Sequence, residues 1–339
     1  MGWKGTVRSI RAAARRAERD ARRRQRELER WQKEQQRITE LEEAAFEVEQ
    51  YENYLDVLQS AHKECGPQID WRAMVGAPEP AEPKRLDTAE RAARDAESSY
   101  EPGFLDRLLK REGTRRAELA VDVERAREMD DSAFRQASAD WRREHQEWKD
   151  NRSLAVGVLA SEPKALIEAI RAVDPFSDLD ALGTSIGFQL EGAGPIEATI
   201  RVHSETVIPT EVKSLLRSGR LSVKTMPKGR FYELFQDYVC SCVLRVANEL
   251  FALLPIRGAI VTAEDALLDT STGHLEEVPI LSTYLARETL EHLDLENIDP
   301  SDSMKNFIHR MRFKKTQGFQ GIERLTPGDL AVGIDSIST

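Results

Sequence analysis

A chain of 339 residues with a formal net charge of -10 is longer than one average domain and acidic overall. This charge argues against a generally basic protein that coats nucleic acid, because whole-protein charge sets the long-range attraction to phosphates. No apolar run approaches the roughly 18 residues that a membrane span needs, and three cysteines cannot all pair with one another, which favours a reducing compartment. We therefore expect a cytoplasmic protein with two structural units and no transmembrane segment.

Residues 1 to 65 carry the pattern of one long first helix. Apolar residues recur at steps near three and four, or multiples of these, and the first proline is Pro67. The positions are Val7, Ile10, Ala14, Ala17, Ala21, Leu28, Trp31, Ile38, Leu41, Ala45, Val48, Leu55 and Leu58. A helix of about fifty residues spans about 80 Å, so it must pack on another helix or project. Arg24 and Gln35 fall at seam positions of the heptad register and interrupt the coiled-coil pattern.

The same segment carries a basic stripe. Its members are Arg8, Arg11, Arg15, Arg19, Arg22, Arg26, Arg30 and Lys33. Their spacing of three and four places all eight within an arc of about 100° on a helix. The stripe has three interpretations: pairing within the helical N-terminal part of the chain or with a partner helix, contact with nucleic acid phosphates, or binding to an anionic membrane. The first is favoured, and the membrane is the weakest because the apolar neighbours are mostly alanine.

A proline-rich acidic connector over 66–87 is expected to separate the first helix from a second helical stretch over 88–153. The second stretch is broken near Pro102-Gly103. Two long helices joined in this way suggest an antiparallel hairpin with the connector as its turn. Trp141 and Trp148 would then meet small residues of the first helix, which are Ala12, Ala13, Ala14 and Ala17.

Residues 154–325 have the composition of a compact α/β domain, and 326–339 resemble a flexible tail. Helices are expected over 162–172, 229–254 and 299–310, and strands over 185–190, 196–202, 221–224, 259–263 and 278–285. Apolar residues cover most of the circumference of 229–254, which predicts a buried central helix. The fold class is therefore α+β: a long N-terminal helical hairpin, coiled-coil-like, and then a compact domain with a mixed sheet around that central helix.

Glu211-Val212-Lys213 is a weak candidate for catalysis. Metal-dependent nucleases use a Glu-x-Lys arrangement, and Asp178 or Asp180 would supply a further metal ligand. The surrounding residues favour a different interpretation, in which Pro209-Thr210-Glu211 begins a short helix over 212–217. We expect capping of that helix to be the main role of Glu211.

A polar seam follows one side of the central helix. Its members, at steps of four, four, four and three, are Glu233, Asp237, Ser241, Arg245 and Asn248. Such a seam would either line a pocket, with Glu233, Asp237 and Arg245 as candidate site residues, or form the solvent-facing edge of the helix. The solvent-facing edge is the favoured interpretation.

Motifs for cofactors and nucleotides are missing from the sequence. No histidine or cysteine pair has zinc spacing, and the glycine-rich phosphate loop, the dinucleotide motif and the Gly-x-Ser-x-Gly elbow are all absent. We therefore expect no cofactor and no bound metal. The leading hypothesis is a non-enzymatic cytoplasmic interaction or scaffold protein, whose arm self-associates or binds a partner while the globular domain supplies a second surface. The alternative is a nucleic-acid-binding protein, including a divergent metal-dependent nuclease.

Overall fold

The structure is a computed structural model that describes residues 3–103, 111–176, 184–190, 194–269 and 271–330. Over 3–30 and 204–205 it describes the backbone alone. The chain divides into two compact units, which we name the sheet unit (1–67 and 174–339) and the hairpin unit (68–173). The fold is α+β, with long helices in the N-terminal part and a mixed five-stranded sheet. The first helix thus shares a unit with the sheet.

The elements of the sheet unit follow both of its chain segments. Its helices are α1 (Trp3–Ser60), the 3-10 turn η1 (Ala61–Lys63), α8 (Ser204–Val207), α9 (Lys228–Leu253), α10 (Arg287–Glu291), α11 (Pro300–Ser303) and the 3-10 turn η2 (Met304–Asn306). Its strands are β1 (Thr184–Gln189), β2 (Ile196–Val202), β3 (Glu211–Leu215), β4 (Leu221–Thr225), β5 (Gly258–Leu268), β6 (Leu275–Ala286), β7 (Ile308–Met311), β8 (Phe313–Lys314) and β9 (Gly318–Phe319).

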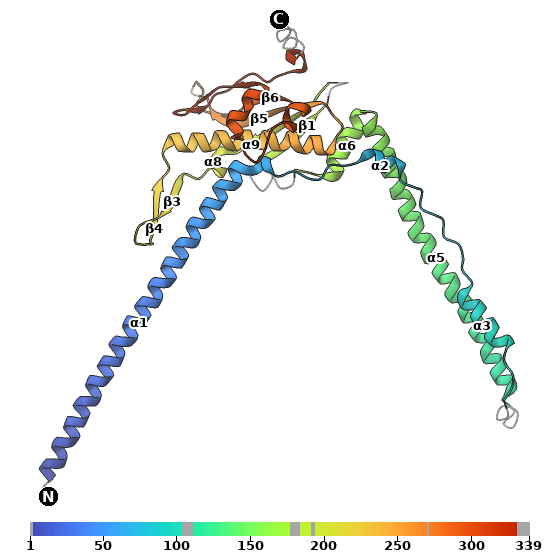
Figure 1. Cartoon of the computed structure of the whole chain (residues 1–339), viewed down its shortest axis with the longest axis horizontal. Coiled ribbons are helices and arrows are strands. Elements are labelled where there is room, and N and C mark those ends of the chain that lie inside the picture. The colour runs from blue at the N-terminus through green and yellow to red at the C-terminus, as the bar shows by residue number, and fades with distance from the viewer. Residues whose placement is uncertain (1–2, 104–110, 177–183, 191–193, 270, 331–339) are drawn as a thin grey trace. The chain divides into compact units, whose positions relative to one another are not determined.

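The main sheet has the order β1-β2-β5-β6-β7. Strands β2 and β5 are parallel, and the other neighbouring pairs are antiparallel. Helix α9 crosses one face of this sheet (Figure 1). Tyr238, Leu244 and Leu250 of α9 are fully buried, and burying each such side chain stabilises the fold by about 1.5–3 kcal/mol. The prediction of a buried central helix is confirmed.

The opposite face of the sheet carries polar residues that the C-terminal segment covers. Thr262 and Ser282 lie opposite each other on β5 and β6, with their hydroxyl oxygens 2.8 Å apart. The backbone N–H of Leu325 donates to Ser282 Oγ at 2.9 Å, and Arg324 forms an ion pair with the buried Glu264. The predicted tail over 326–339 follows this segment, Asp329 within it pairs with Arg310 at 2.8 Å, and residues 331–339 lie outside the described part of the chain.

Two predicted helices of the sheet unit are wrong. Residues 212–217 do not form a capped helix, because β3 pairs antiparallel with β4 as a hairpin. Gly219 lies in the hairpin turn with φ +78°, a conformation that side chains disfavour. The helix predicted over 299–310 ends at Asn306, because β7 pairs with β6 at the edge of the sheet. Asp299 caps α11, since its carboxylate accepts from the Asp302 N–H.

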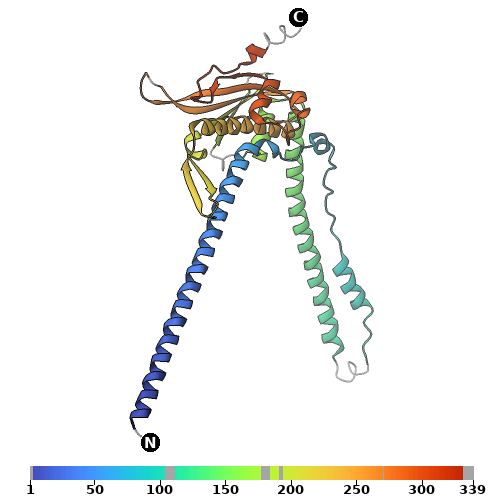
Figure 2. The ribbon, with the colours of Figure 1, turned by 60° about the vertical axis from the view of Figure 1, so that its left-hand side comes forward.

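The hairpin unit is built around one long helix. Its elements are α2 (Trp71–Gly76), α3 (Thr88–Ser98), α5 (Glu112–Leu159) and α6 (Pro163–Val173). The connector over 77–87 and helix α3 run beside α5 (Figure 2). Asp130 of α5 accepts hydrogen bonds from the backbone N–H groups of Ala89 and Glu90 at 3.3 and 2.9 Å. The antiparallel partner of α5 is therefore residues 71–98, and the predicted break near Pro102-Gly103 falls between the end of α3 and the start of α5.

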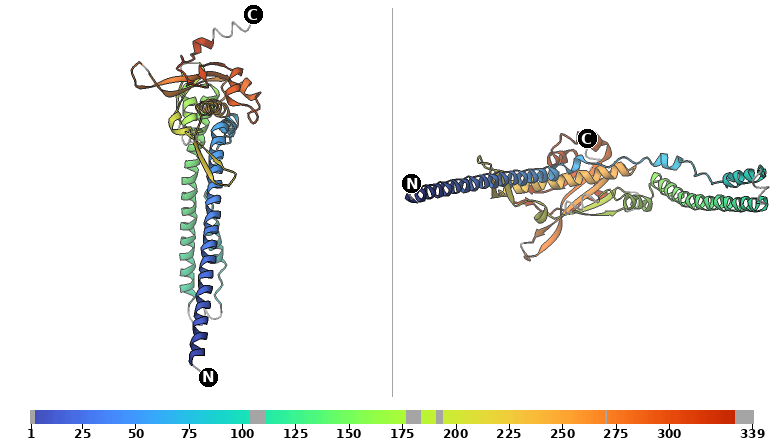
Figure 3. Two further views of the ribbon diagram at one scale, coloured as in Figure 1. Left: turned by 90° about the vertical axis from the view of Figure 1, so that its left-hand side faces the viewer. Right: turned by 90° about the horizontal axis from the view of Figure 1, so that it is seen from below.

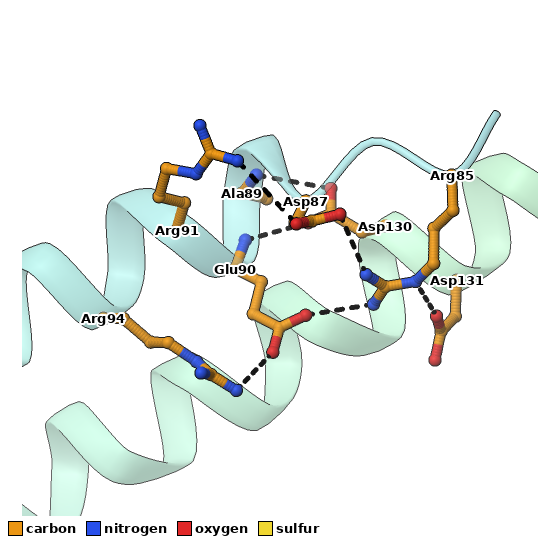
Figure 4. A network of polar contacts seen from close by, with 8 residues as sticks. All are labelled: Arg85, Asp87, Ala89, Glu90, Arg91, Arg94, Asp130 and Asp131. Atoms are coloured by element: carbon orange, nitrogen blue, oxygen red, sulfur yellow. Dashed lines mark hydrogen bonds and ion pairs between the residues drawn. The ribbon is translucent and has the colours of Figure 1, made fainter.

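An ion-pair network fixes α3 to α5 (Figure 4). Arg85 Nε donates to Asp131 at 2.7 Å, and its Nη2 donates to Glu90 at 3.0 Å. Arg94 pairs with the other oxygen of Glu90 at 2.6 Å. Hydrogen bonding to Arg85 holds the pKa of both carboxyls below their ordinary values. The network sets the register between the connector and α5.

The proline-rich connector is held by aromatic side chains of α5. The indole N–H of Trp141 donates to the Pro80 carbonyl at 2.9 Å, and that of Trp148 donates to the Ala77 carbonyl at 3.0 Å. His145 stacks between the two indoles and contacts Glu79 through Nε2 at 2.7 Å. The predicted meeting of these tryptophans with the alanines of the first helix is replaced by this packing.

Backbone rise explains why the connector can run along the helix. Between Ala77 and Arg85 an extended polyproline backbone advances about 25 Å, at roughly 3.1 Å per residue. Their partners Trp148 and Asp131 lie about 26 Å apart along α5, at roughly 1.5 Å per residue. The two lengths agree, so the carbonyls of the connector meet α5 in register. The connector is consequently not the turn that composition suggested.

Replacing Trp148 by alanine is expected to destabilise the hairpin unit by about 2–3 kcal/mol. The variant loses a half-buried ring, its stacking on His145 and its hydrogen bond to the connector. Urea unfolding followed by circular dichroism measures the loss. The control is Met129→Ala, because Met129 is exposed on the same helix. Equal stability of the two variants would show that the connector does not depend on the aromatic contacts.

Candidate functional site

Helix α1 changes character near residue 41. From there to its end, one face packs within the sheet unit, and the buried residues on that face are Ala44, Val48, Tyr51 and Leu58. Over 31–40 every side chain is exposed, including Trp31 (62%) and Ile38 (41%). The backbone continues as helix back to Trp3. We call residues 3–40 the arm and residues 41–60 the anchor.

The anchor lies beside the β3-β4 hairpin and reaches α9 (Figures 2 and 3). Lys213 of β3 forms an ion pair with Glu47 at 3.0 Å. The Tyr54 hydroxyl donates to the Val207 carbonyl at 2.7 Å. A Cβ atom at Gly219 would lie 2.9 Å from Leu41, so the hairpin turn packs close against the start of the anchor. These contacts hold the helix only from about residue 41 onward.

The polar seam of α9 receives the end of α1 and the residues that follow it. Gln59 donates to Asp237 at 2.8 Å. The His62 N–H donates to Ser241 Oγ at 3.0 Å, and His62 Nδ1 lies 2.8 Å from the same oxygen. The Gly66 N–H donates to Glu249 at 2.9 Å. A row of polar groups along α9 therefore meets a row of polar groups at 59–66.

A buried ion pair completes this contact. Arg245 Nη2 lies 2.8 Å from Glu249 Oε1, with the two side chains 8% and 4% exposed. Arg245 Nη1 lies 3.6 Å from the exposed carboxylate of Glu64. Neither Nε nor Nη1 of Arg245 has a hydrogen-bond partner. A buried charge held by so few partners depends strongly on each of them.

His62, in the turn that follows the anchor, makes the contact with α9 sensitive to pH. Burial lowers the pKa of His62 below 6.5, and the charge of Lys63 adds to this, whereas the Leu295 backbone, Glu296 and Asp299 oppose it. Because the folded state resists protonation of this ring, the unfolded state binds more protons at mildly acidic pH. The contribution of neutral His62 to the free energy of unfolding is therefore present above pH 6.5 and is lost as the pH decreases below it.

The free energy of unfolding of the sheet unit is expected to fall between pH 7 and pH 5, and His62→Gln is expected to flatten that decrease. Urea unfolding at several pH values measures it. Burial raises the pKa of Asp237, which acts in the opposite direction, and Asp299 loses stabilisation near pH 4 and below. Restricting the series to pH 5 and above removes the contribution of Asp299, and the difference between the wild-type and variant slopes isolates that of His62. An unchanged slope in the variant would assign the pH dependence to other groups.

The predicted site residues of α9 are thus placed in an internal contact. The interpretation as a solvent-facing edge is wrong for the middle of the seam, because Ser241 is fully buried and Arg245 is nearly so. Glu233 pairs with Lys315 at 2.6 Å, away from Arg245. Sequence inspection missed Gln59, His62 and Gly66, although their spacing of three and four parallels the seam that they meet.

Glu211 and Lys213 do not form a metal site with the residues described. Both lie on β3, where Lys213 is paired with Glu47 and Glu211 is exposed. Asp178 and Asp180 lie outside the described residues. Within the ranges that the structure covers, no three His, Cys, Asp or Glu side chains gather in a way suited to a metal ion.

The basic stripe lies on the arm. The backbone is helical from Arg8 to Lys33, which the interpretation as a stripe requires. Lys33 is exposed, and the side chains of the other seven members lie outside the described part. Three acidic residues of α5 have partners in their own unit: Asp122 with Arg125, Asp131 with Arg85, and Asp140 with Arg143.

One open cleft of about 750 Å³ lies at the edge of the sheet, between β6, β7 and residues 321–323. Its lining residues include His309, Arg310 and Arg312. Arg310 already donates to the Arg324 carbonyl at 2.7 Å and to Asp329 at 2.8 Å. The cleft is therefore a polar surface, and Arg310 in its lining is neutralised within the chain.

None of the helices in the described ranges combines the length and apolar character of a membrane-spanning helix. Comparison with protein-family models, with curated proteins and with solved structures finds no match to this chain.

Proposed function

We propose that the chain is a cytoplasmic interaction protein that self-associates through the arm, with the sheet unit as its body and as a second binding surface. The observation that carries this proposal is the exposure of every side chain over 31–40, with Trp31 and Ile38 among them. Helices in proteins gain most of their stability from packing an amphipathic face. The arm has such a face by sequence, and the sheet unit covers only the anchor.

The heptad pattern defines the face that would associate. Positions 7, 14, 21, 28 and 35 alternate with 10, 17, 24, 31 and 38, which is the spacing of a coiled-coil seam. Eight of these ten residues are apolar.

The free cysteines fit a reducing compartment, since Cys240 and Cys242 are buried and no disulfide joins the described cysteines.

Sedimentation equilibrium of the full chain and of a chain that begins at residue 41 tests the proposal. The full chain is expected to approach twice its 38.4 kDa mass at micromolar concentration. The shortened chain is expected to remain a monomer, because it keeps the anchor but loses the seam. A full chain that stays monomeric at every concentration, or a shortened chain that dimerises equally well, would contradict self-association through the arm.

Polyanion binding by the basic stripe is a second function that the arm supports. At 100° per residue, the stripe lies on the opposite side of the helix from the seam. Association through the seam therefore leaves the stripe available, and Asp122, Asp131 and Asp140 of α5 are already paired within their own unit. A binder that neutralises several phosphates loses affinity steeply as salt rises.

Reversal of three stripe charges, Arg19→Glu, Arg22→Glu and Arg26→Glu, is expected to weaken binding to single- or double-stranded nucleic acid at least about tenfold and to reduce its salt slope. Fluorescence anisotropy over a salt series measures both quantities. An affinity and a salt slope that these substitutions leave unchanged would show that the stripe is not the contact surface.

A further inference from the structure

The sequence of the arm distinguishes a parallel from an antiparallel pair of copies. The inference of this direction rests on the proposed self-association. The seam runs from Val7 to Ile38, so its midpoint lies between residues 22 and 23. The arm itself runs from residue 3 to residue 40, where the anchor begins, and its midpoint lies within about one residue of that of the seam. If a two-fold axis perpendicular to the helix passes through this point, the whole seam of one copy lies alongside the whole seam of a second, antiparallel copy.

The sizes of the seam residues distinguish the two possible directions. In an antiparallel pair centred on the midpoint, each layer joins positions whose numbers sum to 45. The layers are Val7 with Ile38, Ile10 with Gln35, Ala14 with Trp31, Ala17 with Leu28, and Ala21 with Arg24. Three layers then combine an alanine with a long side chain. Facing positions that alternate large and small residues fill a core at nearly constant helix separation.

A parallel pair in register gives a poorer seam. Positions 14, 17 and 21 would form three successive alanine layers, whereas Leu28 would face Leu28 and Trp31 would face Trp31 in the next layer. Helix separation depends on the side chains at the contact, so narrow and wide layers along one straight pair conflict. Arg24 would also face Arg24, which opposes like charges within the seam.

Charge near the midpoint agrees with the antiparallel direction. Asp20 and Glu27 are four residues before and three residues after Arg24, so all three share one side of the helix. In the antiparallel pair this side of one helix faces the same side of the other. The two copies of Arg24 then lie among two copies of Asp20 and two copies of Glu27. The arginine that interrupts the apolar seam thereby acquires partners from both copies.

We infer that the partner of the arm is a second copy of the same arm, aligned antiparallel with residue 17 opposite residue 28. The overlap ends where the anchor begins, because residue 41 of one copy lies opposite residue 4 of the other. The two sheet units are then held at opposite ends of a helix pair about 55 Å long. The dimer presents two basic stripes on its outer faces.

Cysteine cross-linking of the full chain tests the direction. In a Cys65→Ser background, one preparation carries Ala17→Cys and another carries Leu28→Cys, while the native Cys240 and Cys242 stay buried. The antiparallel pair predicts a disulfide dimer in the mixture and almost none in either preparation alone, because the disulfide needs Cβ atoms about 4 Å apart. Ala12→Cys mixed with Lys33→Cys is the matched control: these numbers also sum to 45, but both positions lie on the outer side of the helix.

The outcomes separate the inference from the proposed function. Cross-linking within each separate preparation, with none between them, would show a parallel pair and overturn the inference while self-association stands. A chain that sediments as a monomer and cross-links in no combination would overturn both. Cross-linking of the control pair as strongly as of the 17 and 28 pair would overturn the assignment of the seam.

Discussion

Replacing Glu249 by leucine is expected to lower the free energy of unfolding of the sheet unit by about 3–5 kcal/mol. The variant leaves the guanidinium of Arg245 charged, 8% exposed and without its close carboxylate partner. Removing one member of a buried ion pair is costly because the remaining charge stays desolvated. The same substitution removes the acceptor of the Gly66 N–H, so the segment that follows the anchor loosens as well.

The double variant Arg245→Met, Glu249→Leu is the matched control. Replacing both members of a buried pair by apolar side chains of similar volume is often neutral. We expect the double variant to recover most of the loss, so that a double-mutant cycle gives a coupling of at least about 2 kcal/mol. Urea unfolding of both single variants and the double variant supplies the cycle. Losses that simply add would mean that the two side chains contribute independently.

Replacing Ile38 by aspartate is expected to raise the dissociation constant of the dimer at least about 100-fold. Each dimer would bury two carboxylates at its seam, and a buried charge without a partner costs several kcal/mol. In the single chain Ile38 is exposed, so folding itself should change little. Sedimentation velocity over a concentration series measures the shift.

Gln36→Asp adds the same charge two residues away, about 160° around the helix from Ile38. Gln36 is also exposed, so the two variants differ mainly in the face that they alter. The control is expected to keep the dissociation constant within about threefold. Equal weakening by the two variants would point to a general charge effect in place of a seam.

Local sequence patterns predicted the central part of the sheet unit well. Apolar residues surround α9 on nearly every side, which only a buried helix tolerates. The β1-β2 hairpin and strands β5 and β6 also follow from alternation and turn residues. In these elements the local preference and the tertiary packing agree, so sequence alone was sufficient.

The errors arose where a distant partner decides the local structure. Thr210-Glu211 resembles a helix cap, but β4 supplies strand pairing and Glu47 pairs with Lys213 from a part of the chain far away. The connector has the composition of a turn, yet Trp141 and Trp148 hold it extended along α5. Composition showed that the connector would not continue a helix, but not what would hold it.

Of the contact between α9 and residues 59–66, only the residues on α9 could be predicted from the sequence. Asp237 and Arg245 stood out as polar residues on an apolar helix, whereas Gln59 and His62 meet this seam from about 180 residues earlier in the chain. The spacing of three and four at 59–66 parallels the seam, but spacing alone does not identify two distant segments as partners. Similarly, the heptad pattern defined the seam of the arm, but only the structure shows where the arm ends and the anchor begins.

Amide hydrogen exchange at two protein concentrations, one well below and one well above the dissociation constant, tests the central claim most directly. Exchange reports how often each backbone hydrogen bond opens, and association protects only the segment that it orders. We expect amides over 31–40 to be protected only at the high concentration, and amides over 44–58 to be protected equally at both. Protection of 31–40 that is the same at both concentrations would contradict the account, because the arm would then need no second copy.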